Sequence, residues 1–417
     1  MITLSRQQLL VNEIMDTGFQ YGITGQYTED ATLDGRIVTI HGQEKINFGH
    51  CSYMGLETDE RLKRGSIRAI ERFGTQFSSS RSYISLGLYE ALEAKLETLF
   101  GQPTIVGPTT TLSHFSVLPT FITEQDTVIL DHFAHSSIRL AAQYVQASGT
   151  AVEVVPHNDL NQLENRIQKH LAAGRRHIWY LVDGVYSMQG DVAPLRELQQ
   201  LQQRYEQLYL YIDDAHGMSW TGQHGRGYAL EQLGGLNDQT FLVTSFAKAF
   251  ATGGGAIVCP SELVKKTIRN CGRTLMFSGP LQPAQLGAAL ASADLHLSAE
   301  IYQHQNHLKH RIQHFNRRCR ELGLALVGSS DTPIRYIGVG LPEIGYEIVS
   351  TLIARGFFLN IASFPSVAKN KTGLRITLSN HTTVADIDRL LETTARVVEQ
   401  VFERHEYRHE QVLAAFA

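Results

Sequence analysis

Short apolar runs alternate with amphipathic helical stretches over much of this 417-residue chain, and this alternation constrains the fold more than any other feature. The apolar runs cover residues 104–106, 126–130, 151–155, 177–182, 208–212 and 240–243. Helical periodicity covers residues 60–73, 86–100, 137–147, 159–173 and 193–206. Buried strands that alternate with helices are typical of a mostly parallel sheet covered on both faces. We therefore predict an α/β fold class.

The segments on either side of this region follow other patterns. Residues 1–22 are expected to be helical, and residues 35–48 alternate about Gly42 and Gln43, which predicts a β-hairpin. A long charged helix is predicted over residues 285–322 as a connector between lobes. Strands at 324–327, 334–339, 357–361 and 373–378 and helices at 345–355 and 383–404 predict a small α+β domain. The predicted division is residues 1–58 (helix and hairpin), 59–298 (large domain) and 299–417 (small domain).

Composition excludes several classes of function. The chain is 43% hydrophobic and 19% charged, as is usual for a soluble globular protein, and its net charge of −4 favours neither nucleic acid nor an anionic membrane as a partner. Its four cysteines show no metal-ligand spacing, so we expect no bound metal. Because we find no signal peptide and no apolar run near the ~20 residues of a membrane span, we expect a cytoplasmic protein without a membrane span.

Lys248 stands between the apolar run Phe241–Val243 and the glycines Gly253–Gly255. A desolvated lysine amine has a lowered pKa and is nucleophilic, so it can form a Schiff base. Since most lysines are solvated surface residues, the position alone decides little. The presence of Asp213 upstream, with His216 beside it, favours the catalytic interpretation.

Asp213 directly follows an apolar run and precedes His216 by three positions. In open α/β sheets, ligands bind beyond the carboxyl ends of the strands. An ionised aspartate there keeps the ring nitrogen of a pyridine cofactor protonated and makes the ring an electron sink. The alternative is a helix N-cap beside a buried histidine.

Further polar residues follow other predicted strands. His135 could stack on a planar cofactor or be a hydrogen-bonded structural histidine, and Ser187 could donate to a cofactor hydroxyl or be a turn serine. Thr109, Thr110 and Thr111 precede a helix expected to begin near Leu112, where hydroxyls and amides bind phosphate, although threonine is also a common N-cap.

Arg375 lies within the last predicted strand of the small domain. A buried guanidinium needs an anion, and a carboxylate that accepts two hydrogen bonds is its best partner. That carboxylate could belong to a substrate or to an internal ion pair, and both remain open.

Taken in order, these segments resemble the α-oxoamine synthases, enzymes that use pyridoxal 5′-phosphate (PLP) and have the aspartate aminotransferase-like fold (fold type I). The matching stretches span nearly the whole chain: residues 47–48, 53–56, 131–137, 157–160, 183–195, 212–217, 225–227, 245–248 and 374–375. The resemblance implies a large domain with a mostly parallel seven-stranded sheet and a small C-terminal α+β domain. It also implies a homodimer with a shared active site.

The resemblance also implies a role for each matching residue. Lys248 would hold PLP through a Schiff base, Asp213 would pair with the ring nitrogen, and His135 would stack on the ring. His216 and Ser187 would contact the phenolic oxygen. The remaining roles are phosphate binding by Thr110, Thr111 and Ser245, binding of the partner's phosphate by Ser278, and binding of the amino acid's carboxylate by Arg375.

Some residues depart from the family pattern near the expected substrate entrance. Cys51 stands where family members commonly have asparagine, and Arg81 lies in Ser78–Ser82, where many have a glycine-rich run. We therefore regard Cys51 and Arg81 as substrate-binding candidates. Residues 364–373 also resemble the autoinducer-synthase branch, which makes acyl aminoketone or hydroxyketone signals.

The resemblance predicts decarboxylative condensation of a small amino acid with an acyl thioester, delivered as acyl-CoA or on an acyl-carrier protein. The products would be an α-aminoketone, CO2 and a free thiol. One alternative is another fold-type-I reaction, such as aldol cleavage of a β-hydroxy amino acid or transamination. Another is a non-catalytic subunit that supports a partner chain, but such subunits typically lose the lysine that Lys248 represents.

Overall fold

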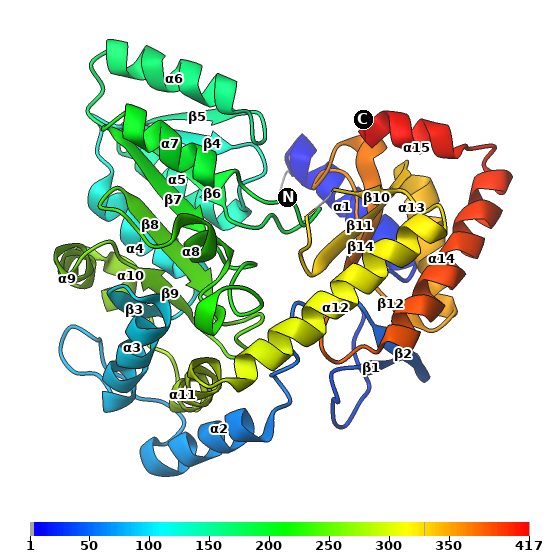
Figure 1. Cartoon of the computed structure of the whole chain (residues 1–417), viewed down its shortest axis with the longest axis horizontal. Helices are drawn as coiled ribbons and strands as arrows, with labels where there is room; N and C mark the ends of the chain where they lie inside the picture. The colour runs from blue at the N-terminus through cyan, green and yellow to red at the C-terminus, as the bar shows by residue number, and fades with distance from the viewer. Residues whose placement is uncertain (1–3, 329, 417) are drawn as a thin grey trace. The chain divides into compact units, whose positions relative to one another are not determined.

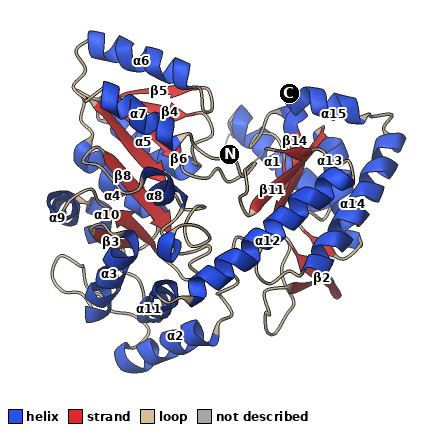
Figure 2. Ribbon diagram, viewed as in Figure 1, coloured by secondary structure: helices blue, strands red, loops and turns tan. Residues whose placement is uncertain are grey.

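The computed structural model describes residues 4–328 and 330–416, with elements labelled in Figure 1 and coloured by type in Figure 2. Its contacts divide the chain into two compact units. The sheet unit comprises residues 54–187 and 191–306, and the terminal unit comprises residues 1–53, 188–190 and 307–417. Among the described residues, no helix is long and apolar enough to cross a membrane.

The sheet unit is built on seven strands in the order β3-β9-β8-β7-β6-β4-β5. The strands are β3 (Thr104–Gly107), β4 (Thr127–Asp131), β5 (Ala151–Val155), β6 (Ile178–Asp183), β7 (Leu208–Asp213), β8 (Thr240–Ser245) and β9 (Gly255–Val258). The pairs from β5 to β8 are all parallel, and β9 is antiparallel to both of its neighbours. The predicted α/β sheet is confirmed. The short strand β9 was not predicted, because it begins within the glycine-rich segment.

Both faces of this sheet are covered, because successive strand residues belong to two separate apolar clusters. Val128 and Leu130 belong to one cluster, and Ile129 between them belongs to the other. The first cluster includes residues of α4 (Thr110–Phe121), α5 (Ser136–Ala147), α9 (Glu262–Cys271) and α10 (Arg273–Phe277). The second includes residues of α3 (Gly87–Phe100), α6 (Leu160–Ala172), α7 (Leu195–Arg204), α8 (Tyr228–Leu233) and α11 (Pro283–Leu297). The near-continuous apolar strands of the sequence therefore reflect burial on both sides.

Helices α2 (Glu60–Phe73) and α11 cross at two glycines. A Cβ atom on Gly65 would lie 2.4 Å from the carbonyl oxygen of Gly287, and one on Gly287 would lie 2.2 Å from that of Gly65. The two backbones are therefore in direct contact, and a larger residue at either position would force them apart.

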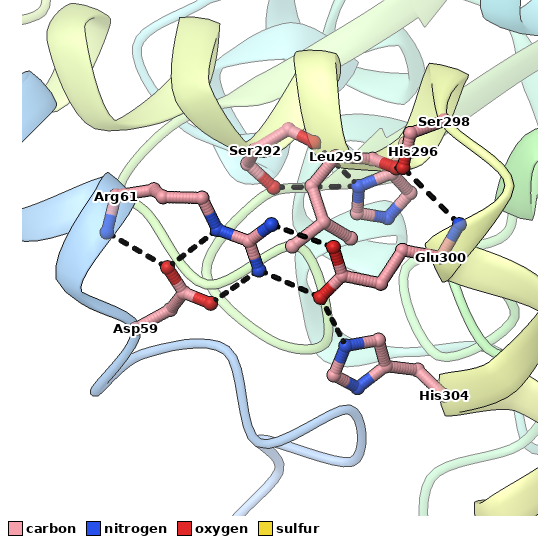
Figure 3. A network of polar contacts seen from close by, with 8 residues as sticks. All are labelled: Asp59, Arg61, Ser292, Leu295, His296, Ser298, Glu300 and His304. Atoms are coloured by element: carbon pink, nitrogen blue, oxygen red, sulfur yellow. Dashed lines mark hydrogen bonds and ion pairs between the residues drawn. The ribbon is translucent and has the colours of Figure 1, made fainter.

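The long helix predicted over residues 285–322 is wrong, because the chain forms two helices there. Helix α11 ends at Leu297 and α12 spans Glu300–Glu321. Ser298 between them is extended, with φ −87° and ψ 166°, and its hydroxyl accepts a hydrogen bond from the amide of Glu300 at 3.2 Å. Arg61 pairs with Glu300 at 2.7 Å, which ties the start of α12 to α2 (Figure 3). The extended backbone of Ser298 thus separates two stretches of the sequence that are both helical.

The terminal unit contains two small sheets. The first has the order β1-β2-β12, with β1 (Ile37–Ile40), β2 (Gln43–Asn47) and β12 (Phe357–Phe358). The second has the order β10-β11-β14-β13, with β10 (Leu326–Val327), β11 (Ile334–Gly340), β14 (Thr372–Thr377) and β13 (Asn360–Ala362). Its helices include α1 (Arg6–Gln20), α13 (Pro342–Ala354), α14 (Val384–Arg404) and α15 (His409–Phe416), and residues 307–321 of α12 also belong to it.

The predicted hairpin is confirmed, since β1 and β2 pair in antiparallel fashion. The single strand predicted over residues 357–361 is wrong, because β12 pairs with β2 and β13 pairs with β14, in different sheets. Both ends of the chain therefore contribute to one unit. The predicted N-terminal helix is present as α1, but residues 1–3 of that prediction lie outside the described residues.

Candidate active site

Polar side chains end three neighbouring strands of the large sheet. Asp183 ends β6, Asp213 ends β7 and Ser245 ends β8, and the two aspartates are register partners. They line a cavity of about 340 Å³ within the sheet unit. Seven predicted site residues lie in its wall: Thr110, Thr111, His135, Asp213, His216, Ser245 and Lys248. The cavity thus lies where ligands bind in open α/β sheets.

Lys248 lies in the tight loop that joins β8 to β9. The loop is closed by hydrogen bonds from the amide of Ala251 to the carbonyl of Lys248 at 3.0 Å and from Thr252 to Phe246 at 2.9 Å. Phe246 and Phe250 are buried, with ring centroids 4.7 Å apart. The apolar rings anchor the loop, so the lysine is presented to the cavity from a rigid support.

The N-terminus of α4 forms another part of the wall. Thr109 is the N-cap, and its hydroxyl accepts from the amide of Leu112 at 3.0 Å, so the helix begins at Thr110. First-turn amides have no intrahelical acceptors and carry the positive end of the helix dipole, which suits a phosphate. A Cβ atom on Gly255 would lie 3.1 Å from the amide nitrogen of Thr110, so glycine lets β9 pass close to this end.

His135 is the N-cap of α5 and lines the same cavity. Its Nδ1 accepts from the amide of Ser137 at 3.2 Å, and its own amide donates to Asp183 Oδ1 at 3.1 Å. Burial lowers the pKa of His135; the charge of Asp213 opposes this, and that of Lys248 adds to it. The ring is therefore neutral near pH 7 and suits stacking on a flat ligand.

Asp213 and Asp183 hold different protonation states. Burial by itself would raise the pKa of Asp213, but the hydrogen bond with His114 and the charge of Lys248 outweigh it and lower that pKa. Burial, followed by the charge of Asp213, raises the pKa of Asp183 well above its usual range. The negative charge is thus favoured on Asp213 and the proton on Asp183. An ionised carboxylate in the cavity wall can bind a protonated ring nitrogen.

His114 and Gln285 belong to the site, and the sequence reasoning missed both. His114 lies in α4, and its Nε2 is 3.1 Å from Asp213 Oδ2. It follows Thr110 by four residues, so it shares that residue's helix face, and this spacing was the available signal. Gln285, from α11, lines the cavity, and a Cβ atom on Gly253 would lie 2.3 Å from its Nε2. No local motif marks a glutamine for this position.

Three predicted residues of the sheet unit are not in the cavity wall, namely Ser187, Ser278 and Arg81. The Ser278 hydroxyl donates to the carbonyl of Thr274. The Arg81 guanidinium lies 3.8 Å from the centre of the Tyr89 ring and pairs with Glu93 at 3.0 Å. Arg81 therefore has internal partners, and its substrate role stays a prediction.

Arg375 and Cys51 lie together in the terminal unit. Arg375 is buried in β14, and its Nη2 is 3.7 Å from Cys51 Sγ. The buried Tyr53 hydroxyl contacts both side chains, and burial, followed by the charge of Cys51, raises its pKa well above the usual range. The structure thus brings two predicted substrate residues into one cluster.

Known proteins resemble this chain over nearly its whole length. Residues 43–393 match the family described as aminotransferase class I and II. The 8-amino-7-oxononanoate synthase of Geobacter sulfurreducens is 32% identical over 88% of this chain and 92% of that protein. The serine palmitoyltransferase of Bacteriovorax stolpii is 29% identical over 89% of this chain and 86% of that protein.

A solved structure shares the fold. The serine palmitoyltransferase of S. paucimobilis, with a bound PLP–myriocin aldimine, has a TM-score of 0.86 at 24% identity, over 96% of this chain and 99% of that one. The chain therefore belongs to the aminotransferase class I and II family and, within it, to the α-oxoamine synthases, PLP-dependent acyltransferases of fold type I.

Proposed function

We propose that this chain condenses a small amino acid with an acyl thioester, with loss of CO2, to give an α-aminoketone and a free thiol. The observation that carries the proposal is the convergence of Lys248, an ionised Asp213 and a neutral His135 on one cavity. Relatives named 8-amino-7-oxononanoate synthase and serine palmitoyltransferase support this reaction class.

The donor set of the cavity fits PLP. Thr110 and Thr111, at the N-terminus of α4, would hold the phosphate together with Ser245. The ring of His135 would face the pyridine ring, and the carboxylate of Asp213 would pair with its nitrogen. The amine of Lys248 is the nucleophile for the aldehyde. Each part of the cofactor thus has a matching group in the wall.

When bound, PLP supplies an electron sink for charge that develops at the α-carbon of the amino acid. Lys248 lines the cavity, and we assign to its Nζ the removal and return of the α-proton as a general base. Asp213 would keep its charge for the ring nitrogen, because His114 Nε2 lies 3.1 Å from its Oδ2. His216 lines the cavity and is proposed to contact the phenolic oxygen with Ser187. We assign the amino acid's carboxylate to Arg375.

We further propose that the enzyme is a homodimer of the cytoplasm whose subunits share active sites, with Ser278 reaching the partner's phosphate. Two large apolar side chains near this segment support self-association, since Tyr83 is 89% exposed and Phe277 is 83% exposed. The Ser80 hydroxyl donates to the carbonyl of Met276, which joins the Tyr83 loop to α10. Light scattering in solution tests the assembly, and a monomer with full activity would contradict it.

The reaction is tested by supplying PLP-loaded protein with single amino acids and acyl-CoA donors. The proposal predicts that CO2 and free thiol are released in equal amounts, and that Lys248→Ala releases neither. Lys266→Ala is the matched control, because Lys266 is an exposed lysine of α9 in the same unit. Aldol cleavage or transamination without release of thiol would contradict the proposal. The mass of the product would assign or exclude the autoinducer-synthase branch.

A further inference from the structure

A buried chain of three side chains runs into the cavity wall from behind Asp213. The Tyr211 hydroxyl lies 2.8 Å from His114 Nδ1, and His114 Nε2 lies 3.1 Å from Asp213 Oδ2. Tyr211 and His114 are fully buried at 0% exposure, and Asp213 is 4% exposed. The three groups come from two elements, α4 and β7, which pack at this edge of the sheet.

The hydrogen-bonding order in this chain follows from the chemistry of its members. A buried phenol needs an acceptor for its proton, and the acceptor that Tyr211 meets is His114 Nδ1. A neutral imidazole that accepts at Nδ1 carries its proton on Nε2, and that N–H points at Asp213. Burial, followed by the charge of Asp213, raises the pKa of Tyr211 well above its usual range, so the phenol stays a donor.

The groups around Asp213 determine how much its ionisation depends on the N–H of His114. Burial favours its protonation, and two further buried carboxyls, Asp183 on β6 and the adjacent Asp214, lie beside it. Lys248 and His114 favour the carboxylate, and the amide of Ala215 donates to Oδ1 at 2.9 Å. The charge of Asp213 also acts on His135, but the ring of His135 is neutral near pH 7 and adds no charge of its own. Without His114, the balance would shift toward a protonated Asp213.

We propose that Tyr211 and His114 form a relay in which Tyr211 sets the tautomer of His114, and His114 holds Asp213 as an oriented carboxylate for the PLP ring nitrogen. His114 is thus a positioning residue that acts through Asp213. The inference rests on the PLP chemistry of the proposed function, but not on which amino acid or acyl donor is used.

Three variants separate the parts of the relay. His114→Leu removes the donor to Asp213, His114→Gln keeps an N–H near the Nε2 position, and Tyr211→Phe removes only the hydroxyl. The first readout is the 15N chemical shift of the ring nitrogen in labelled PLP, followed against pH. We expect the pKa of the ring nitrogen to fall by about one unit or more in His114→Leu, less in Tyr211→Phe and least in His114→Gln.

The second readout is the affinity of cofactor-free protein for PLP and for its 1-deaza analogue, which lacks the ring nitrogen. His114→Leu should bind PLP about tenfold more weakly and bind the analogue as the wild type does, because only PLP uses Asp213. His296→Leu is the control, since His296 is also fully buried, bonds Ser219 Oγ at 2.9 Å and lies outside the cavity wall. It should not change the ratio of the two affinities.

The proposal is overturned if His114→Leu titrates at the ring nitrogen as the wild type does. It is also overturned if His114→Leu weakens PLP and the analogue equally, which would indicate a merely structural role. If His114→Leu does not fold, the same readouts on Tyr211→Phe and His114→Gln decide. Absence of CO2 and thiol release with a normal nitrogen titration would instead contradict the proposed function and leave the relay standing.

Discussion

At the scale of single residues, the chemistry of the cavity depends on which of two buried aspartates keeps a proton. Asp183 and Asp213 are register partners at the ends of adjacent strands. His114 lowers the pKa of Asp213 against the effect of burial, whereas burial and the charge of Asp213 raise that of Asp183. Two identical side chains therefore take different roles, because only Asp213 has a buried imidazole beside its carboxyl group.

This assignment predicts different outcomes for the two asparagine variants. Asp183→Asn replaces a neutral acid by a neutral amide and keeps the acceptor for the His135 amide, so kcat should stay within about tenfold of the wild type. Asp213→Asn removes the charge opposite the ring nitrogen and should lower kcat by at least about a hundredfold. Steady-state kinetics of both variants check this. Equal losses would show that the charge is not held at Asp213.

His157 gives the fold a pH dependence of its own. Burial disfavours its charged form, but hydrogen bonds to Asp131 at 2.9 Å and Asp191 at 2.5 Å outweigh burial and raise the pKa of His157 to about 9. Between the ordinary value of about 6.5 and about 9, the folded state binds more protons than the unfolded state. This contribution to stability is therefore complete below about pH 6.5 and is lost as the pH rises through about 9.

The corresponding experiment compares wild type and His157→Gln by urea unfolding between pH 6 and 9.5. The free energy of unfolding of the wild type should fall relative to the variant, with a slope of at most about 1.4 kcal/mol per pH unit. Curves that stay parallel through this range would show that His157 does not bind a proton more tightly in the folded protein.

The predictable part of the site is the part that lies in local motifs. Lys248, Asp213 and His135 each follow an apolar strand. Because ligands bind at strand ends in open α/β sheets, these three residues could be predicted as site residues from the sequence. His114 and Gln285 lie in or at the start of helices whose roles depend on which strand they pack against. Arg81 was predicted to bind substrate, but its stacking on Tyr89 and its pairing with Glu93 are tertiary contacts that no local pattern shows.

At the scale of elements, the strongest packing constraint is the crossing of α2 and α11. Gly287→Ala places a Cβ 2.2 Å from the carbonyl oxygen of Gly65 and 2.7 Å from the Cβ of Ala69, so the helices must separate. We expect the free energy of unfolding to fall by about 1–3 kcal/mol. Gly87→Ala is the control, because a Cβ there meets nothing within 4 Å, and it should leave stability unchanged or slightly raise it.

Thermal and urea unfolding of both variants measure the difference. Equal stabilities for Gly287→Ala and Gly87→Ala would mean that the crossing tolerates a side chain and that the close approach is not a constraint. Because α11 also supplies Gln285, a looser crossing should weaken PLP binding as well.

Element types were predictable where the apolar period was regular, as in the buried strands of the large sheet. The predicted ends of helices and strands were wrong where a single residue changes the direction of the backbone. Ser298 ends α11, and its hydroxyl accepts from the amide of Glu300, the first residue of α12. Leu359 separates two strands that enter different sheets. Both breaks depend on hydrogen bonds to specific partners, whereas periodicity reports only which side chains are buried.

At the scale of the whole molecule, the two ends of the chain fold into one unit and the middle forms the other. Strand β2, near the N-terminus, pairs with β12. The Arg36 guanidinium donates hydrogen bonds to both carboxylate oxygens of Asp386. Such contacts join segments more than 300 residues apart, so no local pattern could predict them. The family resemblance was the only sequence feature that implied the complete architecture.

The central claim is that Lys248 is the residue that carries PLP. Borohydride reduction of the PLP-loaded protein, followed by proteolysis and mass spectrometry, tests it most directly, with Lys266→Ala as a control that should behave as the wild type does. We predict that the cofactor's mass is found on the peptide that contains Lys248 and that Lys248→Ala carries none. Cofactor on a different lysine, or equal labelling of Lys248→Ala, would contradict the claim.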